Sequence, residues 1–142
     1  DQILWNQRAY PWVAKSSEVQ KIQLMSITLH HHERAKIAEV ISDEVVVKTA
    51  EDGLDLLGNA YYQGADKVII CREHISADFF DLKTGMAGEL LQKFSNYGVK
   101  LAIVGDFTKD TNRSLQDFIR ESNRQGHITF VTTVADALET KI

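Results

Sequence analysis

Two acids and a histidine follow directly on apolar runs in the middle of this chain, and together they could perform acid/base chemistry. Glu73 and His74 come just after the run 67–71, and Asp106 follows the run 99–104. A histidine titrates near neutral pH and a nearby carboxylate can orient it, so His74 with Asp106 or Glu73 would form a general acid/base site. Because single histidines and acids are common on protein surfaces, this enzyme hypothesis stands beside non-catalytic ones.

A second set of residues is suited to binding a ligand or a partner protein. All but one of these residues lie at the ends of predicted helices, where amides, aromatic rings and backbone groups are accessible, and Asp106 follows a predicted strand. They are Asn59, Tyr62, Asp81, Lys83, Thr84, Gly85 and Asp106. We interpret Gly85 and Gly88 first as close packing of a helix on a sheet, and second as room for a ligand or partner to approach the backbone.

The run of three histidines raises the possibility of a metal site. His30 and His32 would project on the same side of an extended strand. Two imidazoles without a third ligand do not make a zinc site, and histidines in turns are usually solvated. The sequence therefore predicts no cofactor, with His30 and His32 as the candidates should a metal bind. The single cysteine, Cys71, excludes an internal disulfide and is expected to be a buried apolar residue.

These side chains must be positioned by an alternation of strands and helices. Leu82, Met86, Leu90, Phe94 and Tyr97 follow at spacings of four, four, four and three, which predicts an amphipathic helix over 82–97 that ends at Gly98. Strands over 67–71 and 99–104 flank it. This strand–helix–strand order predicts a parallel sheet.

The remaining apolar patterns complete the predicted order β-β-β-α-β-α-β-α-β-α. Strands are expected from Ile27, over 36–42 and 45–47, and over 127–132, with a hairpin turn at 31–34. Further helices are expected after a Thr49 cap, after a Ser114 cap and over 134–142. Right-handed crossovers would place the helices on one face of a mostly parallel sheet, and the other face would be open or covered by the N-terminal residues.

Composition indicates a single globular α/β domain with an N-terminal extension. The chain has 142 residues, of which 44% are hydrophobic, and a net charge of −4 without a Lys/Arg block, which disfavours nucleic acid as a partner. No apolar run is long enough to insert in a membrane, so a bacterial, cytoplasmic protein is expected. Residues 1–24 hold both tryptophans and the one proline, and Met25 has the character of a natural start for a domain over 25–142. We expect Trp5 and Trp12 to hold the extension against an apolar groove or a neighbouring subunit, and a homodimer is possible.

Three segments resemble a small bacterial family catalogued as domain of unknown function 4180. They are DLLGNAYYQGAD over 55–66, DFFDLKTGMAGELLQKF over 78–94 and LAIVGDFTKDTNRSLQDFIRESN over 101–123. The resemblance covers most of residues 26–142 and excludes 1–24. It implies a fold but no established activity.

A more distant resemblance is to STAS domains, the fold of anti-sigma-factor antagonists. The matching pieces are DLKTG over 81–85, VKLAIVG over 99–105 and TVADAL over 133–138, about half of the chain. The resemblance implies a regulatory module in which Thr84 lies where STAS domains carry a phosphoacceptor hydroxyl. Lys83 departs from the family's serine at that turn, and helix capping alone would explain Thr84.

Three functions follow as hypotheses. In sheets of this type, ligands bind beyond the carboxyl ends of parallel strands, here at Cys71–His74, Gly105–Asp106 and 132–133. The leading hypothesis is a non-enzymatic binding or regulatory module that uses this edge against a partner protein or a small ligand. The alternatives are a small enzyme built on His74 and Asp106, and a carrier of lipid or another apolar ligand, which would need an open sheet face.

Overall fold

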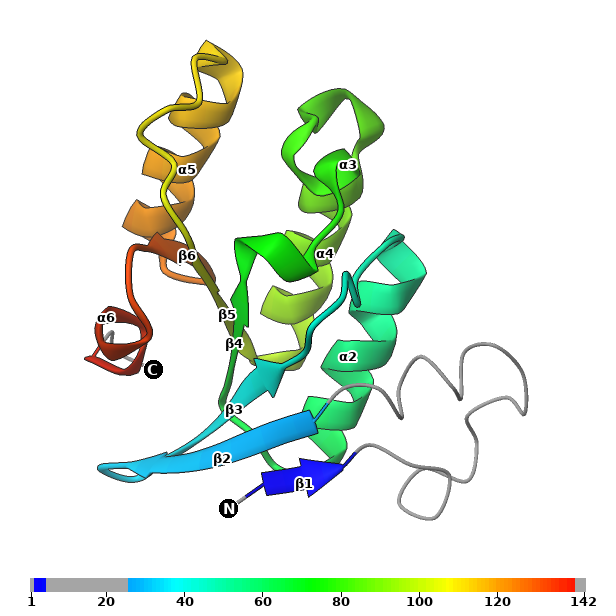
Figure 1. The fold of residues 1–142 in the computed structure, drawn as a ribbon, viewed down its shortest axis with the longest axis vertical. Helices are drawn as coiled ribbons and strands as arrows, with labels where there is room; N and C mark the ends of the chain where they lie inside the picture. Colours follow the sequence, from blue (N-terminus) through cyan, green and yellow to red (C-terminus); the bar gives the residue numbers. More distant parts are fainter. Residues whose placement is uncertain (1, 5–25, 140–142) are drawn as a thin grey trace.

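The computed structural model describes residues 2–4 and 26–139 of the chain, and it contains a six-stranded sheet in sequential strand order (Figure 1). The strands are β1 (Gln2–Leu4), β2 (Ser26–His32), β3 (Ala35–Ile41), β4 (Lys67–Cys71), β5 (Lys100–Val104) and β6 (Ile128–Val131). The two pairings among β1, β2 and β3 are antiparallel, and the three pairings from β3 to β6 are parallel. The predicted α/β class with a mostly parallel sheet and flanking helices is confirmed.

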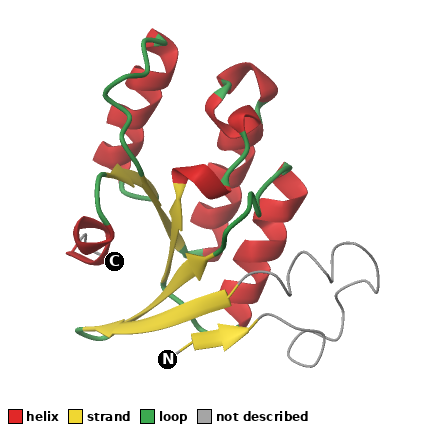
Figure 2. Cartoon of the chain, in the orientation of Figure 1, coloured by secondary structure: helices red, strands yellow, loops and turns green. Residues whose placement is uncertain are grey.

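Three long helices cover one face of this sheet, and a short one lies on the other (Figure 2). The connections β3–β4, β4–β5 and β5–β6 contain α2 (Ala50–Tyr62), α4 (Met86–Tyr97) and α5 (Arg113–Gln125). Each connection joins neighbouring parallel strands with the same hand, so the three helices share a face. In contrast, α6 (Val134–Glu139) packs through Ala137 on Ile37, Ile69 and Ala102 of the opposite face. The expectation of all helices on one face is therefore wrong for α6.

The contact between α6 and the sheet includes a buried lysine. Lys67, at the start of β4, is 1% exposed, and its Nζ donates a hydrogen bond to the carbonyl oxygen of Ala137 at 2.8 Å. Burial, with the charge of Lys100 beside it, lowers the pKa of Lys67 to about 8. The Lys67 amino group thus donates a hydrogen bond to the C-terminal helix, although burial disfavours its charged form.

The predicted strand over 45–47 is not part of the sheet. Val46 and Val47 are buried, but their amides donate to the carbonyl oxygen of His74 at 2.9 and 3.1 Å, and Val47 forms only an isolated parallel bridge with Ile75. These β-branched residues pack beneath the loop after β4 instead of entering the ladder. The additional strand is β1, which the sequence did not indicate; it pairs with β2 so that Leu4 lies opposite Ser26.

The helix predicted over 82–97 is interrupted at Gly85. A short helix α3 (Ala77–Phe80) and a 3-10 turn η2 (Leu82–Thr84) precede it, and α4 begins only at Met86. Gly85 has a φ of 77°, which a residue with a side chain rarely adopts. A Cβ atom at Gly85 or Gly88 would meet no atom within 4 Å, so the interpretation of these glycines as close packing is wrong.

Side-chain caps fix the starts of α2 and α5. Thr49 and Asp52 form a reciprocal capping box at the start of α2, as predicted. For α5 the cap is Asn112 and not Ser114, because the Asn112 side chain accepts a hydrogen bond from the amide of Leu115 at 3.2 Å. Within the described residues, no helix has the length and apolar character needed to cross a membrane.

A side chain of α5 contacts the outer edge of β6. The amide nitrogen of Phe130 donates to Oδ1 of Asn123 at 2.7 Å, and Nδ2 of Asn123 donates to the carbonyl oxygen of Phe130 at 3.3 Å. One carboxamide thus satisfies both backbone groups that Phe130 presents beyond the sheet.

Candidate functional site

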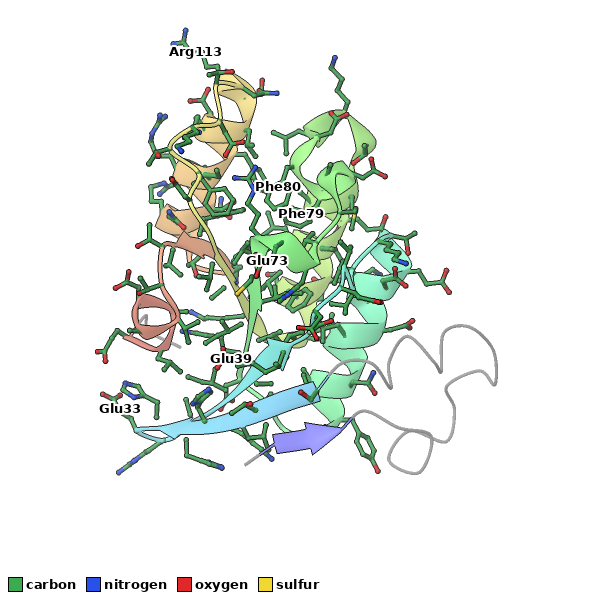
Figure 3. The ribbon with its side chains drawn as sticks, in the orientation of Figure 1. Glu33, Glu39, Glu73, Phe79, Phe80 and Arg113 are labelled. Carbon is green, nitrogen blue, oxygen red and sulfur yellow. The ribbon has the colours of Figure 1, made fainter. Side chains whose placement is uncertain are left out.

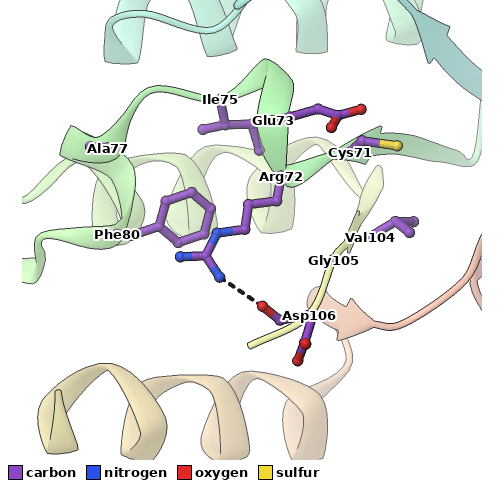
Figure 4. A pocket seen from close by; sticks show the side chains of 9 residues that line it. All are labelled: Cys71, Arg72, Glu73, Ile75, Ala77, Phe80, Val104, Gly105 and Asp106. Atoms are coloured by element: carbon purple, nitrogen blue, oxygen red, sulfur yellow. Dashed lines mark hydrogen bonds between the residues drawn. The ribbon is translucent and has the colours of Figure 1, made fainter. Parts of the chain in front are cut away.

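A pocket of about 610 Å³ opens where β4 and β5 end (Figure 4). Its walls come from the segment after β4, from α3 and from the segment after β5. The lining residues are Cys71, Arg72, Glu73, Ile75, Ala77, Phe80, Val104, Gly105 and Asp106. This is the carboxyl edge of the parallel strands, where sheets of this type bind ligands. It contains Glu73 and Asp106 of the residues proposed from the sequence.

Arg72 connects the two sides of the pocket. Its Nη1 donates to the carbonyl oxygen of Asp106 at 2.9 Å and to Oδ2 of Asp110 at 2.7 Å, while Nη2 donates to Oδ1 of Asp110 at 2.9 Å. The guanidinium carbon lies 4.9 Å from the ring centroid of Phe80 and 4.8 Å from that of Phe107. The two ring centroids are 5.9 Å apart, so the guanidinium lies against an adjacent pair of aromatic rings. A bidentate ion pair with these ring contacts fixes the Arg72 side chain more firmly than a surface ion pair would.

The hydrogen bonds of Arg72 and Asp110 also fix their charges. The Asp110 carboxylate raises the pKa of the guanidinium, and Arg72 lowers the pKa of Asp110. Close packing at the start of the next loop supports the same arrangement, because a Cβ atom at Gly105 would lie 2.9 Å from Cβ of Arg72. The two loops after β4 and β5 therefore meet in one well-defined arrangement.

Asp106 has a local partner in its own loop. Its Oδ1 accepts hydrogen bonds from the amide of Thr108 at 2.9 Å and from the Thr108 hydroxyl at 2.6 Å. These bonds, with the charge of Arg72, lower the pKa of Asp106. The Asp106 carboxylate therefore supports its own loop through Thr108, and the ion pair of Arg72 is with Asp110.

His74 lies beside the pocket and does not line it. The residue is 8% exposed, and its Nδ1 is buried without a hydrogen-bond partner. Its Nε2 is 3.8 Å from Oε1 of Glu73, which is longer than a hydrogen bond. Among the described residues, no hydrogen bond or ion pair joins His74 to Asp106. The structure brings Glu73 and Asp106 to one pocket but does not assemble an acid/base pair with His74.

Cys71, at the end of β4, is a poor nucleophile. Its pKa is raised by burial and by the carboxylates of Glu73 and Glu39. The thiol form is unreactive compared with the thiolate. Cys71 therefore contributes a small, polarisable wall to the pocket.

The histidines predicted as metal candidates lie on β2. His30 Nε2 is 2.8 Å from Oε1 of Glu39 on the neighbouring strand β3, while His32 lies opposite Ala35. No group of three or more histidine, cysteine, aspartate or glutamate side chains in the described part of the chain is arranged to hold a metal ion. Figure 3 shows Glu39 within the sheet and Glu33 at the tip of the hairpin.

Comparison with known proteins identifies a family. The family model described as Domain of unknown function (DUF4180) matches residues 32–141. The chain belongs to this DUF4180 family. No curated protein and no solved structure matches the chain significantly. The resemblance to STAS domains stays a prediction.

The DUF4180 segment also contains the turn from Asp81 to Gly85, which lies outside the pocket lining. The Thr84 hydroxyl accepts a hydrogen bond from the amide of Met86 at 3.2 Å and lies 2.7 Å from the carbonyl oxygen of Asp78 and 2.9 Å from that of Asp81. The Asp81 carboxylate accepts from the amide of Lys83 at 3.2 Å. These exposed residues form a self-satisfied turn before α4, so Asp81 caps the 3-10 turn and not the long helix.

Asn59 and Tyr62 lie at the end of α2, toward the amino ends of the parallel strands in this DUF4180 domain. Asn59 is 3% exposed, with Oδ1 buried and unpartnered, whereas Tyr62 is 65% exposed. The carbonyl oxygen of the adjacent Gln63 accepts from Nζ of Lys36 on β3. The structure therefore separates the proposed contact residues into the pocket, the turn before α4 and the end of α2.

The sequence reasoning named the strand end that includes Arg72 but missed Phe80, Phe107 and Asp110. Arg72 and Phe80 lie in the connection from β4 to α4, whereas Phe107 and Asp110 lie in the loop after β5, and Arg72 and Asp110 are 38 residues apart. Their one common signal is position, since each lies shortly after the end of β4 or β5. The prediction about Trp5 and Trp12 concerns positions outside the described residues.

Proposed function

We propose that this chain is a non-catalytic binding or regulatory module whose carboxyl-edge pocket receives a small ligand or a single side chain of a partner protein. One observation carries the proposal, namely a pocket of about 610 Å³ whose two sides are joined by the Arg72–Asp110 ion pair, with the Arg72 guanidinium against the Phe80 and Phe107 rings. A volume of this size suits a small ligand, and a rigid frame reduces the entropy lost on binding.

The enzyme alternative has less support from the same geometry. A general base must reach the reacting group directly or through one water molecule. His74 is buried outside the pocket lining, and the nearest carboxylate oxygen is 3.8 Å from its Nε2. The Cys71 thiol, with a raised pKa, does not supply a nucleophile either.

The carrier alternative also has less support. Part of the second sheet face is covered by α6, and on β2 and β3 that face presents the His30–Glu39 pair. Among the described residues of β2 and β3, Ile41 is the large apolar side chain with marked exposure, at 40%, so this face presents little apolar surface for a lipid.

The experiment is native mass spectrometry of the full chain purified under mild conditions, with Ala77→Trp as the test variant. Ala77 is an exposed pocket residue in the first turn of α3, so tryptophan should fill the pocket without disturbing the core. Ala135→Trp is the matched control, because Ala135 is exposed in the first turn of α6. We expect a bound mass that Ala135→Trp retains and Ala77→Trp loses. A bound mass that survives Ala77→Trp would contradict the pocket as the binding site.

A further inference from the structure

We propose that the pocket takes a ligand with a positively charged amino or guanidino group on a short apolar body. This inference rests on the proposed function and adds the chemical class of the ligand. It follows from the charged side chains that line the pocket, because Arg72 already has a bidentate ion-pair partner, whereas Asp106 accepts from neutral donors and Glu73 is largely exposed.

The positive charge of the pocket lining is already engaged. Both terminal nitrogens of Arg72 donate to the Asp110 carboxylate, and its guanidinium lies against the neighbouring rings of Phe80 and Phe107. An anionic ligand would have to compete with a bidentate carboxylate that is held in place by the protein. Such charge-assisted forks are among the stronger polar interactions in proteins.

The negative charges of the lining are not balanced in the same way. Asp106 accepts its two hydrogen bonds from neutral donors of Thr108, and the side chain of Glu73 is 78% exposed. The lining therefore contains two carboxylates, those of Glu73 and Asp106, and one guanidinium that Asp110 already pairs with. An excess of negative charge therefore faces the pocket, and it would attract a cation more strongly at low ionic strength.

The behaviour of Cys71 supports this account of the local field. Burial is the largest cause of the raised pKa of its thiol, and the carboxylates of Glu73 and Glu39 raise it further. Cys71 lines the pocket at the end of β4, so the field of these carboxylates reaches the pocket wall. A bound ammonium or guanidinium group would be stabilised by the same field.

The remaining walls define the rest of the ligand. Ile75, Ala77, Val104 and the Phe80 ring offer apolar surface opposite the acids. Figure 4 shows Phe80 and Arg72 on one side of the pocket, with Asp106 and Glu73 on other sides of it. A short aliphatic or aromatic group could lie on the apolar wall while its charged end meets Glu73 or Asp106.

The test is a pair of titrations of the ¹⁵N-labelled full chain followed by its amide signals. The probes are n-butylammonium chloride and sodium butyrate, which carry similar apolar bodies and opposite charges, with sodium chloride added to match ionic strength. We expect saturable shifts of the Glu73 and Asp106 signals with butylammonium alone. The double variant Glu73→Gln/Asp106→Asn should raise its Kd at least five-fold, and Glu89→Gln, an exposed acid on α4, should leave it unchanged.

Each contrary outcome points to a different error. Tighter binding of butyrate at the same signals would overturn the cationic class but leave the pocket as a binding site. If the Kd of butylammonium were unchanged in the Glu73→Gln/Asp106→Asn variant, the assignment of the charge contact to these two acids would be overturned. Absence of a saturable shift with either probe would overturn the inference, and retention of a bound mass by Ala77→Trp would separately overturn the proposed function.

Discussion

Arg72 shows how one side chain can determine the geometry of a pocket. A guanidinium is weakly hydrated, so it can lie against aromatic rings at little cost, and its planar fork matches a carboxylate in both distance and direction. Lysine has the same charge but cannot make the paired hydrogen bonds to Asp110 or stack a planar group on the rings of Phe80 and Phe107. The importance of Arg72 therefore comes from shape as much as from charge.

We expect Arg72→Lys to lower the free energy of unfolding by about 1–2 kcal/mol, because it loses one arm of the fork and the ring contacts. Urea denaturation would measure this. The control is Arg120→Lys, since the Arg120–Asp117 pair is 76% and 57% exposed and should change stability by less than about 0.5 kcal/mol. Equal effects of the two substitutions would show that the aromatic environment adds nothing.

Lys67 predicts a pH dependence of stability. Its pKa is about 8 in the folded chain, whereas the ordinary lysine value of 10.5 applies once unfolding exposes the side chain to water. Between these two values the unfolded state binds more protons, so stability should rise as the pH increases from 8 to 10.5. The rise is on the order of 3 kcal/mol, and the same amount is lost as the pH falls back to 8.

The measurement is urea denaturation at several pH values for the wild type and for Lys67→Met. Methionine fills a similar volume without a charge, so the rise between pH 8 and 10.5 should be largely absent in this variant. Lys93→Met, on the exposed face of α4, controls for the removal of a lysine in general. Identical slopes in all three proteins would refute the assignment to Lys67.

Thr84 is expected to respond to substitution according to both roles of its hydroxyl. It accepts a hydrogen bond from Met86 and can donate to a carbonyl oxygen of Asp78 or Asp81. Thr84→Ser preserves both functions, whereas Thr84→Ala and Thr84→Asp lose the donor, so both should cost about 1 kcal/mol in urea denaturation. If Thr84→Asp were as stable as Thr84→Ser, accepting the hydrogen bond from Met86 would be sufficient for stability. If Thr84→Asp captured different proteins from cell extract in a pull-down than Thr84→Ser, a phosphorylation switch would be favoured.

At the scale of elements, local patterns predicted the type of most segments but not where every one ends. Alternation and β-branched residues identified 67–71 and 99–104 correctly, since these strands are buried on both faces. The same logic failed for 45–47, because burial beneath a loop selects the same residue types as burial in a sheet. The helix over 82–97 was placed too early, since Leu82 continues the apolar spacing across a turn that Gly85 interrupts.

Gly85 and Gly88 predict opposite responses to alanine. Gly85 has a positive φ, so Gly85→Ala should destabilise the chain by about 1–2 kcal/mol. Gly88 lies inside α4 with open space where a Cβ would be, so Gly88→Ala should stabilise it by about 0.5–1 kcal/mol. Urea denaturation of the two variants tests the helix boundary, because a continuous helix from Leu82 would make both substitutions stabilising.

At the scale of the molecule, we predict that residues 26–142 fold without the N-terminal segment. Among the residues whose burial the structure describes, the core clusters contain Ile27 and later residues, and the DUF4180 match begins at residue 32. Loss of β1 removes an edge strand, so the thermal midpoint should fall while the transition stays cooperative. Scanning calorimetry of the truncated and full chains would show this, and a transition without a cooperative heat peak would refute it.

The sequence could predict the edge of the sheet that carries the pocket, but not the pocket itself. The edge follows from strand direction, which the βαβ order determines. The pocket depends on Arg72 meeting Asp110 across 38 residues and on two phenylalanines from different loops, and no local pattern encodes such a meeting. Similarly, α6 has too few residues for its sequence to indicate which face it covers.

The contact of Asn123 with Phe130 has a consequence for assembly. An outer parallel strand offers free peptide groups onto which another chain can add, and such addition can propagate into fibrils. The Asn123 carboxamide imitates the peptide group of a following strand and occupies the position where β6 would otherwise template one. β6 is only four residues long, so blocking the peptide groups of one residue removes much of its capacity to pair with a strand of another chain. Polymerisation through this edge of the sheet is therefore disfavoured.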